Sequence, residues 1–269
     1  MPPKLSKDAV QKAIDNLSNA DKPAESDFKV LLTAGQKGDN ELKEMAAAYT
    51  PRFATSFSEK LQKEALSVML DLLESSDANI SRRIYQNLEK FYSLDPEKIA
   101  NAFFTGLGNS DQTISDLSNT TIKKLADTQE GFLPILFEAL PKQSDESQAQ
   151  MVQFIKSNVK FTEENVDKLL EVLEVAFKTC LIDGLELCRK NKKLLDEEKM
   201  RPLVDKLLTM LDKSLQSDFL NVSKELLVPL FKFTKTMGNE ATTRLLTIIT
   251  ERVLPQFDQL PLNIKEAVM

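Results

Sequence analysis

The chain has 269 residues, a formal net charge of −6, and neither histidine nor tryptophan. The missing histidine excludes catalytic triads with an imidazole base and the common histidine-containing zinc sites. The acidic balance disfavours a nucleic-acid-binding body, because phosphate recognition depends on clustered lysine and arginine. It fits a protein that meets a basic partner. We expect no enzymatic activity, no cofactor and no metal.

Aspartate residues recur at intervals of about 34 to 38 residues, the period typical of stacked helical repeats. Four of the six follow a serine. A short polar side chain before a helix accepts hydrogen bonds from the first unpaired N–H groups. We therefore interpret these residues as the starts of successive helix pairs: Asp39, Asp77, Asp111, Asp145, Asp183 and Asp218.

The segment from Ser76 to Phe91 shows the pattern most clearly. It is predicted to be an acidic cap followed by one amphipathic helix, with Ile80, Ile84, Leu88 and Phe91 on a single face. The same phase follows the aspartates at positions 39, 111 and 145. The unit that starts at position 183 fits worst, because charged residues occupy two of its expected apolar positions.

Apolar periodicity and turn residues predict helices along nearly the whole chain. Pro51 stands inside one of them, where we expect a kink and not an end. The predicted ranges are 8–19, 26–35, 39–57, 58–74, 77–93, 96–107, 111–127, 131–140, 145–160, 162–181, 183–195, 196–215, 218–237 and 239–257, with the start of another helix at 262–269.

These elements predict an all-α fold, a right-handed α-solenoid of antiparallel helix pairs of the HEAT or armadillo kind. We expect a single domain over residues 1–269 with about seven pairs. The chain ends on an apolar face without a polar capping repeat, and we favour truncation over a partner bound there. No signal peptide or membrane-spanning run is seen.

Two cysteines, Cys180 and Cys188, are too few for a disulfide framework and indicate a reducing compartment. We expect both to be buried or half-buried apolar residues. Gly106 and Gly108 form a G-x-G without the strand and third glycine of a dinucleotide site, so we interpret them as a helix end and turn. Arg82 and Arg83 are expected to pair with acids of neighbouring repeats.

Two charged clusters each have two interpretations. The basic cluster Arg189, Lys190, Lys192 and Lys193 matches a weak nuclear-localisation signal, but we favour a solvated helix end. The acidic positions on the predicted helix 162–181 would form either a groove for a basic ligand or an ordinary solvent face, and we favour the second. They are Glu163, Glu164, Asp167, Glu171 and Glu174.

Several stretches resemble the apoptosis inhibitor 5 family, also called antiapoptosis clone 11. They are Met45 to Phe53 (MAAAYTPRF), Leu70 to Phe91, Val228 to Phe231 and Val253 to Pro255, in the same order as in the family. The resemblance covers nearly the whole chain. The positions kept in the first two stretches are Ala46, Ala47, Pro51, Phe53, Leu70, Asp71, Leu72, Glu74, Asp77, Ile80, Arg82, Leu88 and Phe91.

The resemblance implies a non-catalytic protein-interaction scaffold that suppresses apoptosis, is mainly nuclear and also cytoplasmic, and acts as a monomer. It implies three partners: Acinus, fibroblast growth factor 2 and the DEAD-box helicase of mRNA export. The family's longer C-terminal half, with its leucine-zipper-like heptads and basic tail, is not matched. The alternative function is a transport adaptor of the karyopherin or clathrin-adaptor type, since those proteins also use helical repeats.

The resemblance also implies a protein-binding acidic patch at Asp145 and Glu186, which match acidic positions of the family. Cys180 and Leu181 stand where the family has further carboxylates. The family's acetylated lysine falls near Phe233, beside Lys232, so that feature does not clearly transfer. Asp145 and Glu186 are therefore the predicted site residues.

Overall fold

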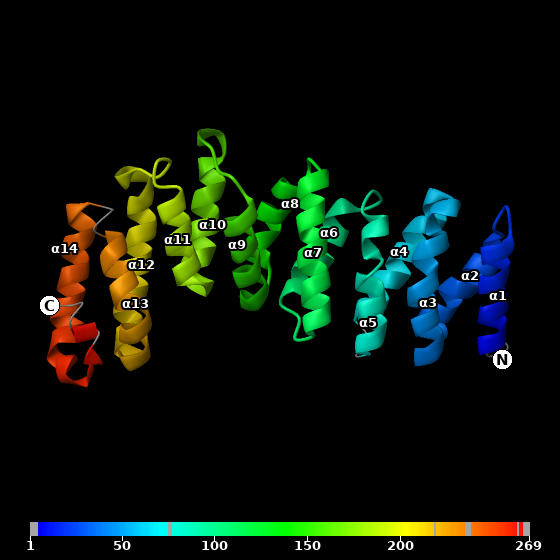
Figure 1. The fold of residues 1–269 in the computed structure, drawn as a ribbon, viewed down its shortest axis with the longest axis horizontal. Coiled ribbons are helices and arrows are strands. Elements are labelled where there is room, and N and C mark those ends of the chain that lie inside the picture. The colour runs from blue at the N-terminus through cyan, green and yellow to red at the C-terminus, as the bar shows by residue number, and fades with distance from the viewer. Residues whose placement is uncertain (1–4, 75–76, 218, 235–237, 263, 266–269) are drawn as a thin grey trace. The chain divides into compact units, whose positions relative to one another are not determined.

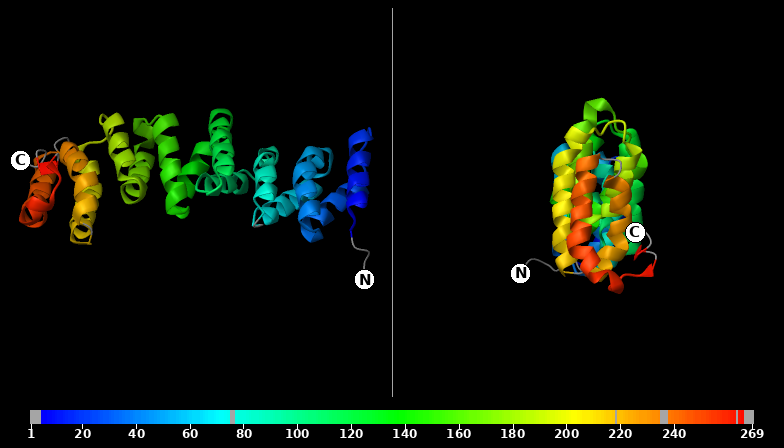
Figure 2. Two further views of the ribbon diagram at one scale, coloured as in Figure 1. Left: turned by 60° about the horizontal axis from the view of Figure 1, so that its bottom comes forward. Right: turned by 90° about the vertical axis from the view of Figure 1, so that its left-hand side faces the viewer.

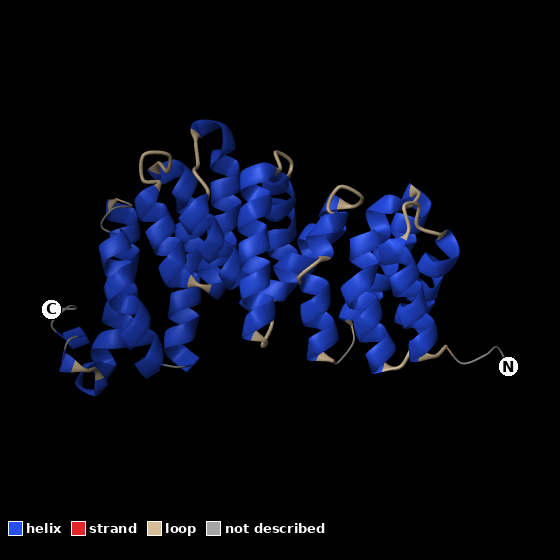
Figure 3. Cartoon of the chain, turned by 45° about the vertical axis from the view of Figure 1, so that its right-hand side comes forward, coloured by secondary structure: helices blue, strands red, loops and turns tan. Residues whose placement is uncertain are grey.

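The computed structural model describes residues 5–74, 77–217, 219–234, 238–262 and 264–265. Every regular element in these ranges is helical and none is a strand (Figure 3), so the predicted all-α class is confirmed. The chain divides into two compact units, Met1–Ser147 (unit 1) and Gln148–Met269 (unit 2). Among the described helices, none is long and apolar enough to cross a membrane.

In unit 1, each helix packs against its neighbour in sequence and often against the helix two places along. Helix α1 contacts α3, α3 contacts α5, and α5 contacts α7 (Figure 1). Helix α2 likewise contacts α4, and α6 contacts α8. The helices of unit 1 are α1 (Lys7–Asn19), α2 (Glu25–Lys37), α3 (Asn40–Phe53), α4 (Glu59–Leu73), α5 (Ala78–Tyr85), α6 (Pro96–Leu107), α7 (Gln112–Thr128) and α8 (Phe132–Ala139).

Unit 2 repeats this contact pattern. Helix α10 contacts α11 and α12, helix α11 contacts α13, and α12, α13 and α14 pack on one another (Figure 2). Helix α9 (Asp145–Asn158) begins in unit 1 and continues into unit 2. The remaining helices are α10 (Val166–Thr179), α11 (Leu181–Lys190), α12 (Glu197–Ser217), α13 (Phe219–Thr234) and α14 (Asn239–Ile248).

The repeated aspartates cap three helices of unit 1 as predicted. Asp39 accepts a hydrogen bond from the Leu42 amide (3.1 Å) at the start of α3. Asp77 and Asp111 each accept one from the second residue of α5 and α7, at 2.9 Å in both cases. Each carboxylate thus satisfies an amide that has no partner within its own helix.

The cap assignment is wrong for two later aspartates. Asp145 is already the first residue of α9, and the Ser144 hydroxyl accepts the bond from the Ser147 amide (3.3 Å). Asp183 lies inside the first turn of α11, whose N-cap position is held by Cys180. Both acids still lie near the positive end of a helix dipole. Asp218 lies outside the described residues.

The predicted core face is confirmed, but the single helix over residues 77–93 is wrong. Ile80, Ile84, Leu88 and Phe91 are all buried. Helix α5 nevertheless ends at Tyr85, and a 3₁₀ turn, Leu88–Phe91, follows. The Asn87 side chain donates to the Arg83 carbonyl (3.0 Å), which replaces a backbone bond and closes the helix early.

Prolines mark two further departures from the predicted ranges. Helix α3 runs through the buried Pro51, as expected, but stops at Phe53 and gives way to a 3₁₀ turn, Ala54–Ser56. The predicted helix 239–257 ends at Ile248 and widens into a π turn, Ile249–Val253, before a 3₁₀ segment. Pro255 lacks the N–H that an α-helix would need there, which favours this change of winding.

The prediction for the last residues is tested only in part. Residues 262, 264 and 265 are helical, and the amides of Ile264 and Lys265 both donate to the Pro261 carbonyl. The rest of the predicted helix 262–269 lies outside the described residues.

Candidate protein-binding groove

Asp145 and Glu186, the two predicted site residues, lie in different units. Asp145 is exposed on the first turn of α9. Glu186 is on the solvent side of α11, with 47% of its side chain exposed. The expectation that both belong to one protein-binding site remains a prediction.

Glu186 is held by a lysine that the sequence interpretation did not consider. The Lys156 ammonium donates to the carboxylates of Asp183 and Glu186, and its distance to Glu186 Oε2 is 2.7 Å. The Lys156 side chain is only 16% exposed. The hydrogen bond and charge of Lys156 lower the pKa of Glu186, and the two acids raise the pKa of Lys156. Glu186 therefore already has an internal counter-charge.

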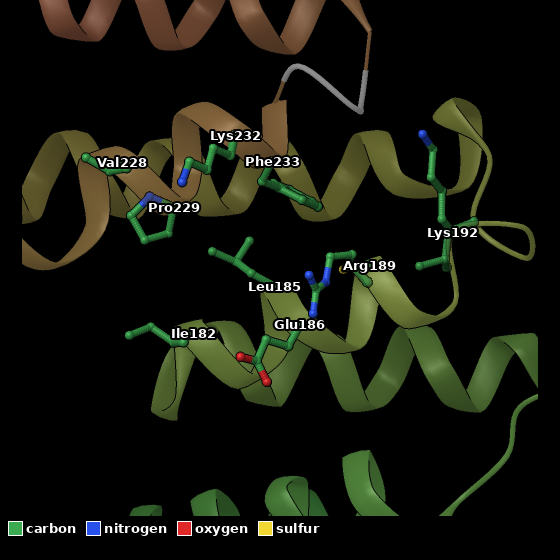
Figure 4. A pocket seen from close by; sticks show the side chains of 11 residues that line it. Ile182, Leu185, Glu186, Arg189, Lys192, Val228, Pro229, Lys232 and Phe233 are labelled. Atoms are coloured by element: carbon green, nitrogen blue, oxygen red, sulfur yellow. The ribbon is translucent and has the colours of Figure 1, made fainter. Parts of the chain in front are cut away.

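A hollow of about 400 Å³ lies beside Glu186, between α11 and α13 (Figure 4). We call it the α11–α13 groove. In Figure 4, Leu185 projects from α11 into the space that faces Val228 and Pro229 of α13. Its apolar lining consists of Ile182, Leu185, Leu195, Val228, Pro229 and Phe233.

The wall of the groove is built by close packing of three helices. Gly184 of α11 lies so near α10 that a Cβ there would meet the Phe177 ring at 2.8 Å. Phe177 in turn contacts Phe233 of α13 edge to face, with ring centroids 6.2 Å apart. This geometry is favourable for aromatic rings and fixes Phe233 as one side of the groove. Ile182, by contrast, is 55% exposed at its mouth.

Charged side chains form the rim. Glu186, the one carboxylate among the described lining residues, stands with Arg189, Lys192 and Lys232. Arg189 and the two lysines make no ion pair with any residue that the structure describes. Glu186 shares Lys156 with Asp183, and the three cations outnumber this one carboxylate, so the described rim carries an excess of positive charge. An anionic, partly apolar ligand fits this combination.

The two thiols are poorly suited to chemistry. Cys188 lines the groove but is buried, and burial raises its pKa from about 9 to about 12. Cys180 is half-buried, and burial raises its pKa too. The thiolate is the reactive form, so burial lowers the reactivity of both thiols. This confirms their interpretation as buried or half-buried residues.

The other predicted features have structural roles. Gly106 lies in the last turn of α6 and Gly108 is its C-cap, so their interpretation as a helix end is confirmed. The Arg82 guanidinium bonds the Asp111 carboxylate (2.7 Å), which links α5 to the cap of α7 as expected. The Asp111 pKa is lowered, first by that hydrogen bond. Arg83 lies 3.8 Å from Glu44 of α3.

The two charged clusters lie on solvated surfaces, as the favoured interpretations expect, and the localisation signal stays a prediction. The basic cluster occupies the last turn of α11 and the turn after it, where Lys190 donates to the Lys156 carbonyl (2.9 Å). On α10, Glu171 pairs with Lys168 and Glu174 with Lys206, at 2.9 and 2.6 Å. The acidic face is thus solvated and partly neutralised. No group of three or more metal-ligating side chains is found within the described ranges.

No curated protein matches the chain. A family model described as apoptosis inhibitory protein 5 matches residues 8–269, which spans both units and the α11–α13 groove. The chain therefore belongs to the apoptosis inhibitory protein 5 family.

Proposed function

We propose that the chain is a non-catalytic protein-interaction scaffold that restrains apoptosis by binding nuclear protein partners, with a link to mRNA export. The match of the family model over residues 8–269 carries this proposal. The contact pattern of the helices supports it, because stacked helix pairs offer long side-chain faces to protein partners.

The architecture that we propose for this role is a right-handed α-solenoid of antiparallel helix pairs. Small-angle X-ray scattering of the full chain tests it. A compact globule of this length has a radius of gyration of about 18 Å, and a solenoid should exceed that clearly. A measured value at the globular figure would remove the solenoid from the proposal.

The proposed partners are an Acinus-like protein, the DEAD-box helicase of mRNA export and fibroblast growth factor 2. The full chain, immobilised and incubated with nuclear extract, should recover the helicase and the Acinus-like protein. Recovery of neither would overturn the scaffold role. Binding that instead required Ran or a membrane would favour the transport adaptor.

A basic partner such as fibroblast growth factor 2 should need the predicted acidic positions. Asp145→Lys should weaken it, because Asp145 is exposed at the start of α9. At the second position, Glu186→Gln removes the negative charge of the side chain and keeps its shape. Unchanged binding of purified growth factor by both variants would remove the two residues from the site.

A further inference from the structure

We propose that the α11–α13 groove binds an amphipathic helix with acidic flanks from a partner protein. The proposal rests on the scaffold function above and specifies the partner for one surface. It runs against the simple expectation from net charge, which is that an acidic chain meets basic ligands.

The apolar part of the groove sets the kind of ligand. Ile182 keeps 55% of its surface exposed, while Leu185 and Phe233 are buried beneath the same hollow. A volume of about 400 Å³ accepts a few large apolar side chains. A helix presents such side chains on one face at spacings of three and four residues, the recurring way in which peptides fill a groove between helices.

The rim sets the charge of the ligand. Positive charge borders the hollow from both of its walls (Figure 4). Arg189 lies on α11, Lys192 in the turn after it, and Lys232 on α13. None of the three is ion-paired within the described part of the chain, whereas Glu186 is bonded to Lys156. Carboxylates beside the apolar face of the ligand would pair with these cations. Cationic flanks would be repelled.

A single-stranded nucleic acid would also be drawn to three cations. It would need bases stacked on exposed aromatic faces and a basic track along its backbone. The aromatic side chain of this groove, Phe233, is only 7% exposed and is already packed against Phe177. The groove therefore favours the helix, and the oligonucleotide becomes an arm of the test.

The test uses the full chain and two fluorescein-labelled, stapled helical peptides of about 15 residues. Both carry leucine on one face, and one has glutamate and the other lysine on the flanks. Fluorescence anisotropy in about 150 mM salt, where the Debye length is about 8 Å, measures their affinities. We expect the glutamate peptide to bind more tightly, and to weaken as salt is raised. A labelled single-stranded RNA of equal length is the third probe.

Charge reversal at the rim provides the specific control. Arg189→Glu and Lys232→Glu should each weaken the glutamate peptide about threefold to tenfold, as expected for one exposed ion pair turned into a repulsion. The double variant should prefer the lysine peptide. Lys193→Glu changes the net charge equally beside the groove, but Lys193 does not line it, so its effect should be small. Far-ultraviolet circular dichroism verifies that each variant is folded.

Three results would overturn the proposal. They are equal binding of the two peptides by the unchanged chain, equal effects of Lys232→Glu and Lys193→Glu, and tighter binding of the RNA than of the glutamate peptide. A failure confined to these peptides, with the nuclear partners still recovered by the unchanged chain, would leave the scaffold role standing. Loss of the nuclear partners with intact peptide binding would overturn the scaffold role and leave the peptide-binding groove standing.

Discussion

Gly106 is the position where the packing of unit 1 is most sharply testable. It lies one residue before the end of α6 and is buried. A Cβ at this position would overlap the Ser118 hydroxyl and would meet two ring carbons of Tyr85 at 2.7 and 2.9 Å. Replacing Gly106 with alanine should therefore destabilise the contact of α6 with α5 and α7.

The two neighbours differ in how far they can move. The Ser118 hydroxyl is buried without a hydrogen-bond partner among the described residues, so a change of rotamer relieves its clash at little cost. Tyr85 is fixed, because its hydroxyl donates to the Ala102 carbonyl (3.0 Å) and its ring packs against Phe103. Overpacking of this kind costs about 1 to 3 kcal/mol. Alanine regains up to about 1 kcal/mol over glycine within a helix, which leaves a net loss of up to about 2 kcal/mol.

The assay can be restricted to unit 1. The chain has no tryptophan, and its three tyrosines, Tyr49, Tyr85 and Tyr92, all fall in Met1–Ser147. Tyrosine fluorescence during urea unfolding therefore reports this unit, while circular dichroism reports the whole chain. With a urea dependence of about 2 kcal/mol per molar, the midpoint should fall by up to about 1 M.

Gly131→Ala is the matched control, because nothing lies within 4 Å of a Cβ at that position. Its midpoint should stay close to that of the unchanged chain. Adding Ser118→Ala to Gly106→Ala should recover only the part of the loss that comes from the hydroxyl. If Gly106→Ala were as harmless as Gly131→Ala, α6 would not approach Tyr85 as closely as described, and the packing of these helices would be wrong.

Three further changes test other parts of the chain. Leu88→Ala should cost about 2 to 5 kcal/mol by tyrosine fluorescence, because Leu88 is fully buried; an unchanged midpoint would place it outside the core. Lys156→Met should lower the free energy of unfolding in urea by about 1 to 3 kcal/mol, because it leaves the carboxylates of Asp183 and Glu186 without their cation. Neutralising both acids in the same variant should restore part of this loss. The pKa of the Cys188 thiol is about 12 in the folded state and about 9 in the unfolded chain. The unfolded chain therefore loses this proton first as pH rises, and the free energy of unfolding should fall above about pH 9. Cys188→Ala should flatten this decline by up to about 1.4 kcal/mol per pH unit, and identical slopes would show that the thiol is not buried.

Helix starts could be predicted from the sequence better than helix ends. A cap such as Asp39 acts on an amide three residues away, so its signal is local and survives in any fold. The end of α5 depends on the Asn87 side chain reaching a carbonyl, a choice that the continuing apolar stripe conceals. Leu88 and Phe91 remain buried because the 3₁₀ turn keeps them facing the core. The periodicity thus identified the core correctly and the winding incorrectly.

The α11–α13 groove could not be predicted in the same way. Its two sides come from Ile182 to Leu195 and from Val228 to Phe233, and only the packing of α11 against α13 brings them together. The sequence did contain both parts, a basic cluster after α11 and an apolar segment around Pro229. Nothing local to either part indicates that they face each other.

Glu186 illustrates why charge has to be counted over a surface and not along a chain. Taken alone, its carboxylate suggested an acidic contact for a basic partner. In the fold, Lys156 approaches it from α9, Arg189 lies one turn further along α11, and Lys232 stands on α13 across the hollow. A ligand that reaches Glu186 through the groove therefore meets more positive than negative charge. A basic partner and an acidic helix should therefore compete only if they approach α11 from the same side. If they approach from different sides, Glu186→Gln should weaken only the basic partner and Lys232→Glu only the acidic helix.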